Sequence, residues 1–118
     1  MATAHVPVSD MLVTVKSREL QRGTLAEMRG DRTGAARHLL AAAHLELVLA
    51  DDYEQWGQLD LALRSRLSAA SCFWRAGQPD HASKIFDAMV QEHPTQERAI
   101  REVIATLEHD YPKPSSSV

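Results

Sequence analysis

Two similar stretches of the 118-residue sequence decide its fold: GDRTGAARHL at residues 30–39 and GQPDHASKIF at residues 77–86. In each stretch a glycine supplies the left-handed conformation that ends a helix. A helix begins directly after each glycine. Asp31 precedes the helix of the first stretch. In the second stretch Pro79 is tolerated in the first helical turn, where a backbone N–H would have no intrahelical hydrogen-bond acceptor. The two stretches therefore predict two successive helix–turn–helix units.

The composition fits an all-α domain. Hydrophobic residues make up 44% of the chain and aromatic residues only 5%, and the apolar share is dominated by alanine and leucine, which favours close-packed helices over a sheet. A chain of this length is expected to form one domain, which we place at residues 9–111. We expect residues 1–8 to be a flexible N-terminus and residues 112–118 a disordered tail, because the tail has no apolar material to offset the cost of ordering.

Charge and targeting signals exclude several classes of protein. The net charge of −3 argues against nucleic-acid binding, which needs clustered Lys and Arg facing phosphates. The single cysteine, Cys72, allows no intramolecular disulfide. No leader-like segment or run of roughly 18 apolar residues occurs, so we expect a cytoplasmic protein that does not enter a membrane.

The apolar spacing predicts about five helices. The first begins at Ser9 or Asp10 and ends at Gly30, and the second begins after Asp31. We expect a break at residues 51–54, because Asp51 and Glu54 have the spacing of a capping box. The second helix should bury one stripe of residues at intervals of three and four: Ala36, Leu39, Leu40, Ala43, Leu47 and Ala50.

The third helix is expected to be long, running from this break to Gly77. Its apolar line consists of Trp56, Leu59, Leu63, Leu67, Ala70 and Trp74. Both tryptophans are therefore interpreted as core residues, with Trp74 the better candidate for a binding anchor. The fourth helix begins at Pro79 and ends before Pro94.

A fifth helix follows, and we expect Thr95 to cap it. Its buried face is predicted to carry five residues: Ile100, Val103, Ile104, Leu107 and Tyr111.

The later unit resembles the tetratricopeptide repeat (TPR), a helix–turn–helix unit of about 34 residues. Phe73 falls at the Tyr position of the repeat, Gly77 in its turn, Ala82 at its small helix contact, Phe86 at its aromatic position and Pro94 at its closing proline. The unit departs from the pattern where Arg66 replaces Trp and where residues 69–70 are Ala-Ala rather than Leu-Gly.

The earlier unit matches less completely. It keeps Gly23, Gly30, Ala35 and Leu39 at the small, turn, close-approach and aromatic positions, and it departs at Glu19, Arg22, Ala26 and Leu47. The two turn glycines are 77 − 30 = 47 residues apart, more than one repeat. We therefore expect the second and third helices to be lengthened. The predicted architecture is a TPR-like, right-handed stack of two antiparallel helical hairpins and a C-terminal capping helix.

The resemblance implies a non-catalytic adaptor or scaffold that binds a protein or peptide partner in a groove lined by its first and third helices. The groove residues expected on this basis are Ser17, Leu20, Thr24, Glu27, Arg64, Leu67, Ser71, Trp74 and Arg75. The TPR subclass that grips a terminal carboxylate does so with Lys and Asn, and this chain has no Asn. The alternative is a self-associating homodimer with a structural role, held together by the aromatic end of the third helix.

No residues point to an enzyme, a cofactor or a metal. His38 and His44 are six residues apart and diverge around a helix, and Pro94 separates His93 from Glu97. Cys72, next to aromatic residues, is interpreted as a small packed residue rather than a nucleophile.

Overall fold

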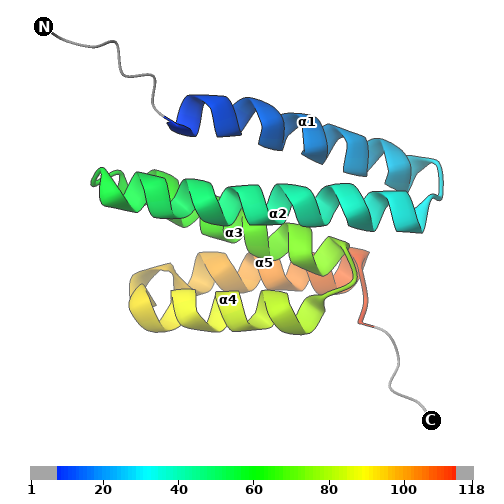
Figure 1. The fold of residues 1–118 in the computed structure, drawn as a ribbon. Helices are drawn as coiled ribbons and strands as arrows, with labels where there is room; N and C mark the ends of the chain where they lie inside the picture. Colours follow the sequence, from blue (N-terminus) through cyan, green and yellow to red (C-terminus); the bar gives the residue numbers. More distant parts are fainter. Residues whose placement is uncertain (1–7, 114–118) are drawn as a thin grey trace, which may run out of the picture.

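The computed structural model describes residues 8–113, and within this range the chain contains α-helices and one short 3₁₀ turn but no strand. The helices are α1 (Val8–Met28), α2 (Arg32–Gln55), α3 (Leu59–Arg75), α4 (Pro79–Glu92) and α5 (Glu97–Asp110), and the 3₁₀ turn η1 (Pro94–Gln96) precedes α5 (Figure 1). The prediction of an all-α fold with five helices is confirmed. Most of the expected flexible N-terminus and tail lies outside the described residues.

The first three connections share one backbone geometry. Gly30, Gly57 and Gly77 adopt φ values of 75°, 74° and 88°, in the left-handed region that favours glycine. The N–H of each glycine bonds to the carbonyl three residues earlier, and the N–H of the next residue bonds to the carbonyl five residues before it. This pair of bonds is the Schellman motif, which satisfies carbonyls that a helix end would otherwise leave unpaired. Each helix can therefore end within one turn and reverse direction.

The expected break at residues 51–54 is wrong, because α2 continues to Gln55 and turns at Gly57. Asp51 and Glu54 lie in the last turns of α2, where both carboxylates contact the guanidinium of Arg66 on α3. They bridge two helices instead of capping one. As a result α2 has 24 residues, and α3 is shorter than expected, with 17.

Trp56 and Leu59 are exposed, whereas the sequence predicts that both lie in the core. Because the turn lies at Gly57, Trp56 follows the last residue of α2 and Leu59 begins α3, and their exposed fractions are 68% and 62%. Trp74, by contrast, is buried as expected. The two tryptophans therefore occupy opposite ends of the α2–α3 hairpin, and only Trp74 belongs to the core.

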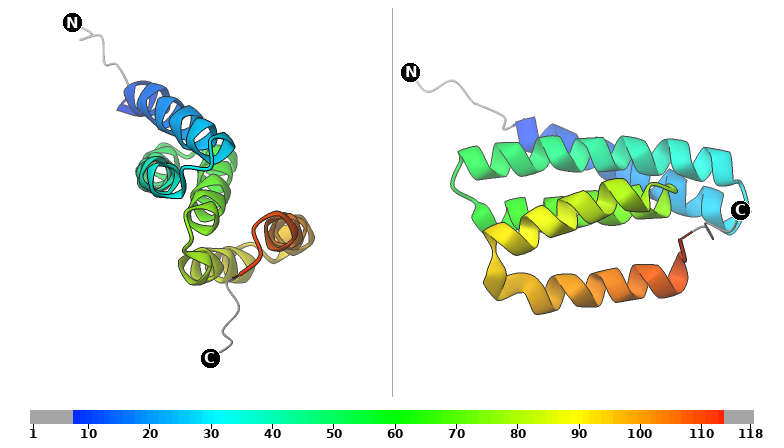
Figure 2. Two further views of the ribbon diagram at one scale, coloured as in Figure 1. Left: turned by 90° about the vertical axis from the view of Figure 1, so that its right-hand side faces the viewer. Right: turned by 90° about the horizontal axis from the view of Figure 1, so that it is seen from below.

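The helices form two layers when viewed end-on. In Figure 2, α2 and α4 lie on one side, α1, α3 and α5 lie on the other, and successive helices run antiparallel. The central helix is α3, which packs against α2, α4 and α5, whereas the backbone of α1 approaches only α2. Side chains from α3 complete the contact with α1, as described below.

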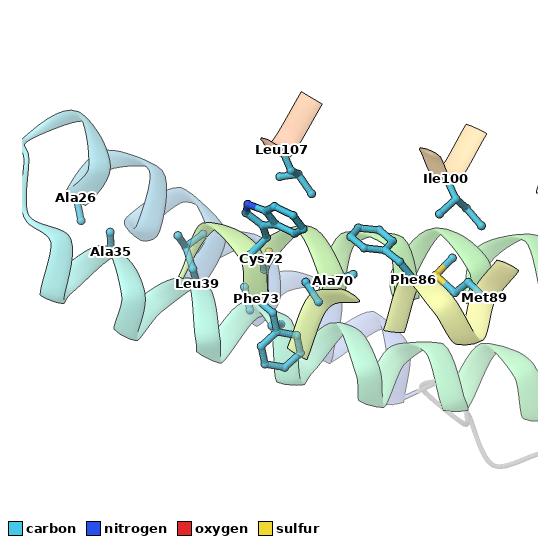
Figure 3. Packing of buried hydrophobic residues seen from close by; sticks show 14 residues of the cluster. Ala26, Ala35, Leu39, Ala70, Cys72, Phe73, Phe86, Met89, Ile100 and Leu107 are labelled. Atoms are coloured by element: carbon cyan, nitrogen blue, oxygen red, sulfur yellow. The ribbon is translucent and has the colours of Figure 1, made fainter. Parts of the chain in front are cut away.

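Small residues occupy the helix crossings. Ala42, Ala43, Ala69, Ala70 and Ala82 are fully buried, and Figure 3 shows how the labelled members of the buried cluster gather between the helices. These alanines let backbones approach closely, and the gaps between crossings are filled by a few large side chains: Leu39, Leu49, Phe73, Phe86 and Ile100.

Gly23 lies where α1 packs tightly against Leu39 of α2. A Cβ atom at this position would lie 2.8 Å from Cγ of Leu39, a side chain with no exposed surface. The packing at this crossing therefore requires glycine on α1.

The expected cap of α5 is also wrong. Thr95 lies inside η1, and the residue before α5 is Gln96, whose side chain makes no capping hydrogen bond. Pro94 begins the 3₁₀ turn, which leads directly into α5. The predicted buried face of α5 is observed, with Ile100 and Leu107 buried and Val103, Ile104 and Tyr111 partly buried.

None of the helices in the described range is long and apolar enough to cross a membrane.

Ala82→Leu tests the packing of α4 against the core. Ala82 has no exposed surface, so a leucine must push neighbouring atoms aside, at a cost of typically about 1–3 kcal/mol. Thermal or urea unfolding should show this loss. The control is Ala88→Leu on the exposed side of the same helix, and equal stability of the two variants would contradict the observed register of α4.

Candidate functional site

Three of the expected groove residues meet at the C-terminal ends of α1 and α3. Nη2 of Arg75 donates to Oε1 of Glu27 over 2.6 Å and to Oγ1 of Thr24 over 3.2 Å. The helix spacing explains the meeting, since residues 24 and 27 lie one turn apart on the side of α1 that faces α3. Arg75 therefore joins two helices whose backbones do not touch.

Tyr111, just after α5, completes this cluster. Its hydroxyl donates to Oε1 of Glu27 over 3.4 Å, and the guanidinium carbon of Arg75 lies 5.8 Å from the centre of its ring. Burial raises the pKa of the Tyr111 hydroxyl, against the opposing effect of the Arg75 charge. Burial alone would lower the pKa of Arg75, but the hydrogen bond and the charge of Glu27 outweigh it, and the net shift is upward. Arg75 therefore stays protonated where it contacts Glu27 and Tyr111.

A pocket of about 670 Å³ opens beside this cluster. Its walls come from the α1–α2 turn, the α3–α4 turn and the segment after α5: Glu27, Gly30, Arg32, Ala35, Ala36, Trp74, Arg75, Ala76, Gly77, Pro79, Tyr111, Pro112 and Lys113. Three of these residues are cationic and one is anionic, which leaves a net charge of 3 − 1 = +2 on a largely apolar lining. Such a site suits an apolar group that carries or adjoins a negative charge.

Trp74 forms a wall of the pocket and is fixed there by the segment after α5. Its indole Nε1 donates to the carbonyl of Tyr111 over 2.7 Å, and the Lys113 ammonium lies 5.3 Å from the centre of its ring. Only 4% of Trp74 is exposed. It is therefore positioned as a preformed surface of the pocket and not as a free aromatic anchor.

The other expected groove residues lie along the same two helices without joining the cluster. Ser17 and Arg64 are exposed, and Leu20 and Leu67 are partly buried against the core. The hydroxyl of Ser71 donates to the carbonyl of Leu67 over 3.0 Å, within its own helix.

Sequence reasoning missed Arg32 and Lys113 as residues of the site, and it placed Tyr111 only as core. The contacts of Tyr111 and Lys113 span up to 84 residues of sequence. No local pattern indicates them, because the return of the chain to this end depends on the length of α5.

A buried carboxylate lies farther along the contact between α1, α2 and α3. Glu46 is 4% exposed, and its Oε2 lies 3.7 Å from Nζ of Lys16. Burial raises the pKa of Glu46, although the Lys16 charge and the hydroxyls of Ser68 and Ser65 oppose the shift. Loss of solvation thus outweighs the ion pair at this position.

The pKa of Glu19 shifts in the opposite direction from that of Glu46. Its Oε2 lies 2.6 Å from Nδ1 of His38, and its Oε1 accepts from Arg22 over 3.1 Å. The hydrogen bond from His38 and the nearby positive charges lower the pKa of Glu19, against a smaller opposing effect of burial. The Glu19 carboxylate is therefore stabilised in its charged form where it links α1 to α2.

The remaining reactive side chains of the described residues are not grouped into a further site. Cys72 is 4% exposed, and burial raises its pKa to about 11, which is typical of a packed thiol. In the range 8–113 no three His, Cys, Asp or Glu side chains are grouped closely enough to hold a metal ion.

No model of a known protein family matches the chain, and no curated protein or solved structure matches it either.

Glu46→Gln is expected to raise the free energy of unfolding at pH 7. The pKa of Glu46 in the folded state lies above the unfolded value of 4.5. The protonated carboxyl therefore adds to the folded protein's stability below pH 4.5, and this stability is lost as the pH rises through the folded pKa. Glutamine removes this dependence, so its advantage over the wild type should shrink toward pH 4. Urea unfolding of both proteins between pH 4 and 8 measures the difference.

Glu19→Gln is the control of opposite sign. A lowered pKa contributes stability above 4.5 that is lost as the pH falls through the folded value. This variant should therefore be less stable than the wild type at pH 7 and approach it in acid. If Glu46→Gln behaves in the same way, the carboxylate of Glu46 is net stabilising and the balance inferred above is wrong.

Tyr111→Ala tests how the pocket wall is held. In a Trp56→Phe background Trp74 is the only tryptophan, and loss of the Tyr111 ring should loosen the segment whose carbonyl accepts from its indole. We expect the Trp74 fluorescence to shift to longer wavelength and acrylamide quenching to rise several-fold. Tyr53→Ala, at the far end of α2, is the control. An unchanged spectrum would show that the wall does not depend on Tyr111.

Proposed function

We propose that the protein is a TPR-like interaction module, an adaptor without catalytic activity, that binds a peptide or helix in the groove lined by α1 and α3. Two helical hairpins followed by a single helix support this proposal, because that order of elements is the one in which TPR units present their first helices on one face. The small residues at the crossings, Gly23, Ala35 and Ala82, agree with it as well.

The single observation that carries the proposal is the pocket beside Arg75. It combines a preformed apolar wall, Trp74, with three cationic side chains, and the Arg75–Glu27 pair holds α1 and α3 in place around it. Interaction sites typically bury an anchoring side chain in such a pocket and surround it with polar groups. A partner segment would place an apolar side chain against Trp74 and an acidic group near Arg32 and Lys113.

Self-association is a second candidate, favoured by the exposure of Trp56 and Leu59 at the tip of the α2–α3 hairpin. Large exposed apolar side chains that lie next to each other often mark contact surfaces. In this case the protein would have a structural role as a homodimer.

Site-specific photo-crosslinking distinguishes a groove from other surfaces. Benzoylphenylalanine replaces Ser17 or Arg64, which are exposed on α1 and α3, and in a control it replaces Asp87, which is exposed on α4. We expect both groove positions to capture the same protein from a native lysate, and the α4 position not to capture it. Equal capture from Asp87 would contradict binding in the groove.

Sedimentation at micromolar concentration tests the second candidate. If the groove receives a different protein, the purified chain should be a monomer. A concentration-dependent dimer that Trp56→Ser and Leu59→Ser dissociate, without lowering the melting temperature, would instead favour self-association through the hairpin tip.

A further inference from the structure

The outer side of α1 carries an exposed stripe that the groove does not use. The stripe consists of Met11, Val15, Arg18, Arg22 and Leu25, and its apolar members are 45–64% exposed. The intervals alternate between four and three residues, which is the spacing with which one helix packs along another. At 100° per residue, the stripe points away from Thr24 and Glu27, the residues that meet α3.

The two ends of the helical stack differ in character. α1 lies at one end and α5 at the other (Figure 2). No large apolar side chain is exposed on α5, and its surface carries the ion pairs Arg98–Glu102 and Arg101–Glu97 at 3.7 and 3.1 Å. The α5 end is thus closed by a polar surface, whereas the α1 end presents an apolar stripe that no element of the described chain covers.

The charges on the stripe select the kind of helix that can cover it. Arg18 is exposed, and Arg22 is only partly neutralised, because its partner Glu19 also bonds to His38. In a pair of identical α1 helices whose stripes overlap along their full length, whether parallel or antiparallel, Arg18 lies at the midpoint of the stripe and faces Arg18 of the other copy. Like charges directly opposed disfavour that pairing.

A membrane surface fits the stripe poorly as well. Helices that lie on anionic lipid carry their cationic side chains on the polar face, next to the headgroups. Here Arg18 and Arg22 lie between the apolar residues, so burial of Met11 and Leu25 in lipid would draw the guanidinium groups toward the hydrocarbon.

We propose that the α1 stripe binds an amphipathic helix of another protein, with apolar side chains at the ends of its contact face and carboxylates in the middle. The apolar side chains pack against Met11, Val15 and Leu25, and the carboxylates accept hydrogen bonds from Arg18 and Arg22. This surface is separate from the α1–α3 groove, so the two proposals fail or succeed independently.

Two designed, labelled helical peptides test the proposal directly. Both carry leucine at the outer contact positions, and they differ only at the two central positions, which are Glu in one peptide and Lys in the other. By fluorescence anisotropy the Glu peptide should bind on the order of tenfold more tightly, because two exposed ion pairs replace two repulsions. Its advantage should shrink between 50 and 500 mM salt, since exposed pairs are screened.

Charge reversal on the protein provides the decisive comparison. The double variant Arg18→Glu with Arg22→Glu should prefer the Lys peptide, and Arg18→Gln with Arg22→Gln should bind both peptides equally. The matched control, Arg98→Glu with Arg101→Glu, changes the net charge by the same amount at the α5 end and should keep the original preference. Circular dichroism melts confirm that each variant is folded.

Several results would overturn the proposal. They are equal binding of both peptides by the wild type, an unchanged preference after charge reversal, a homodimer that Met11→Ser dissociates, or binding to phosphatidylserine vesicles with no binding of the Glu peptide. The first two would show that the charges do not select the partner. The third would identify a second copy as the occupant, and the fourth a lipid surface.

Discussion

Neighbouring helices in this protein pack closely at glycine and alanine residues, and the side chains of the candidate site are positioned by that close packing. Gly23 lies so close to Leu39 that even a Cβ atom at this position would be only 2.8 Å from Cγ of Leu39. Ala70 and Ala82 are completely buried within the same core. Because the crossings fix the rotation of each helix about its axis, they also decide which polar residues of α1 face α3 and which face outward.

Charged side chains add further contacts between α1 and the other helices. The backbone of α1 touches only α2, and polar side chains make additional links between the helices: Lys16 to Glu46, Glu19 to His38 and Glu27 to Arg75. The links differ in their energetic character, since burial opposes ionisation of Glu46 while hydrogen bonding favours it at Glu19. The third link lies in the lining of the pocket beside Arg75, and Tyr111 and Lys113 line it as well.

Much of the fold could be predicted from local signals, and the errors have specific physical causes. Gly30 and Gly77 indicated their turns correctly, because a left-handed helix end needs glycine whatever surrounds it. Gly57 has the same role, but the capping-box spacing of Asp51 and Glu54 predicts a break before it, and this error misplaces Trp56 and Leu59. A carboxylate can cap its own helix or pair with a neighbouring one, and the sequence around Asp51 does not show that Arg66 lies opposite. The positions of Thr24, Glu27 and Arg75 on facing sides of α1 and α3 follow from helical spacing, whereas the return of the segment after α5 to Trp74 does not.

The unequal ends of the stack give the molecule a direction. A protein that assembles head to tail with copies of itself must present complementary surfaces at its two ends. Repeated addition of copies then produces a filament. Here α5 ends the stack in paired charges and exposes no large apolar side chain that could pack against Met11, Val15 and Leu25 of the α1 stripe. Stacking of α1 of one copy on α5 of the next is therefore disfavoured. A short helical stack of this kind can remain a discrete particle even at high concentration.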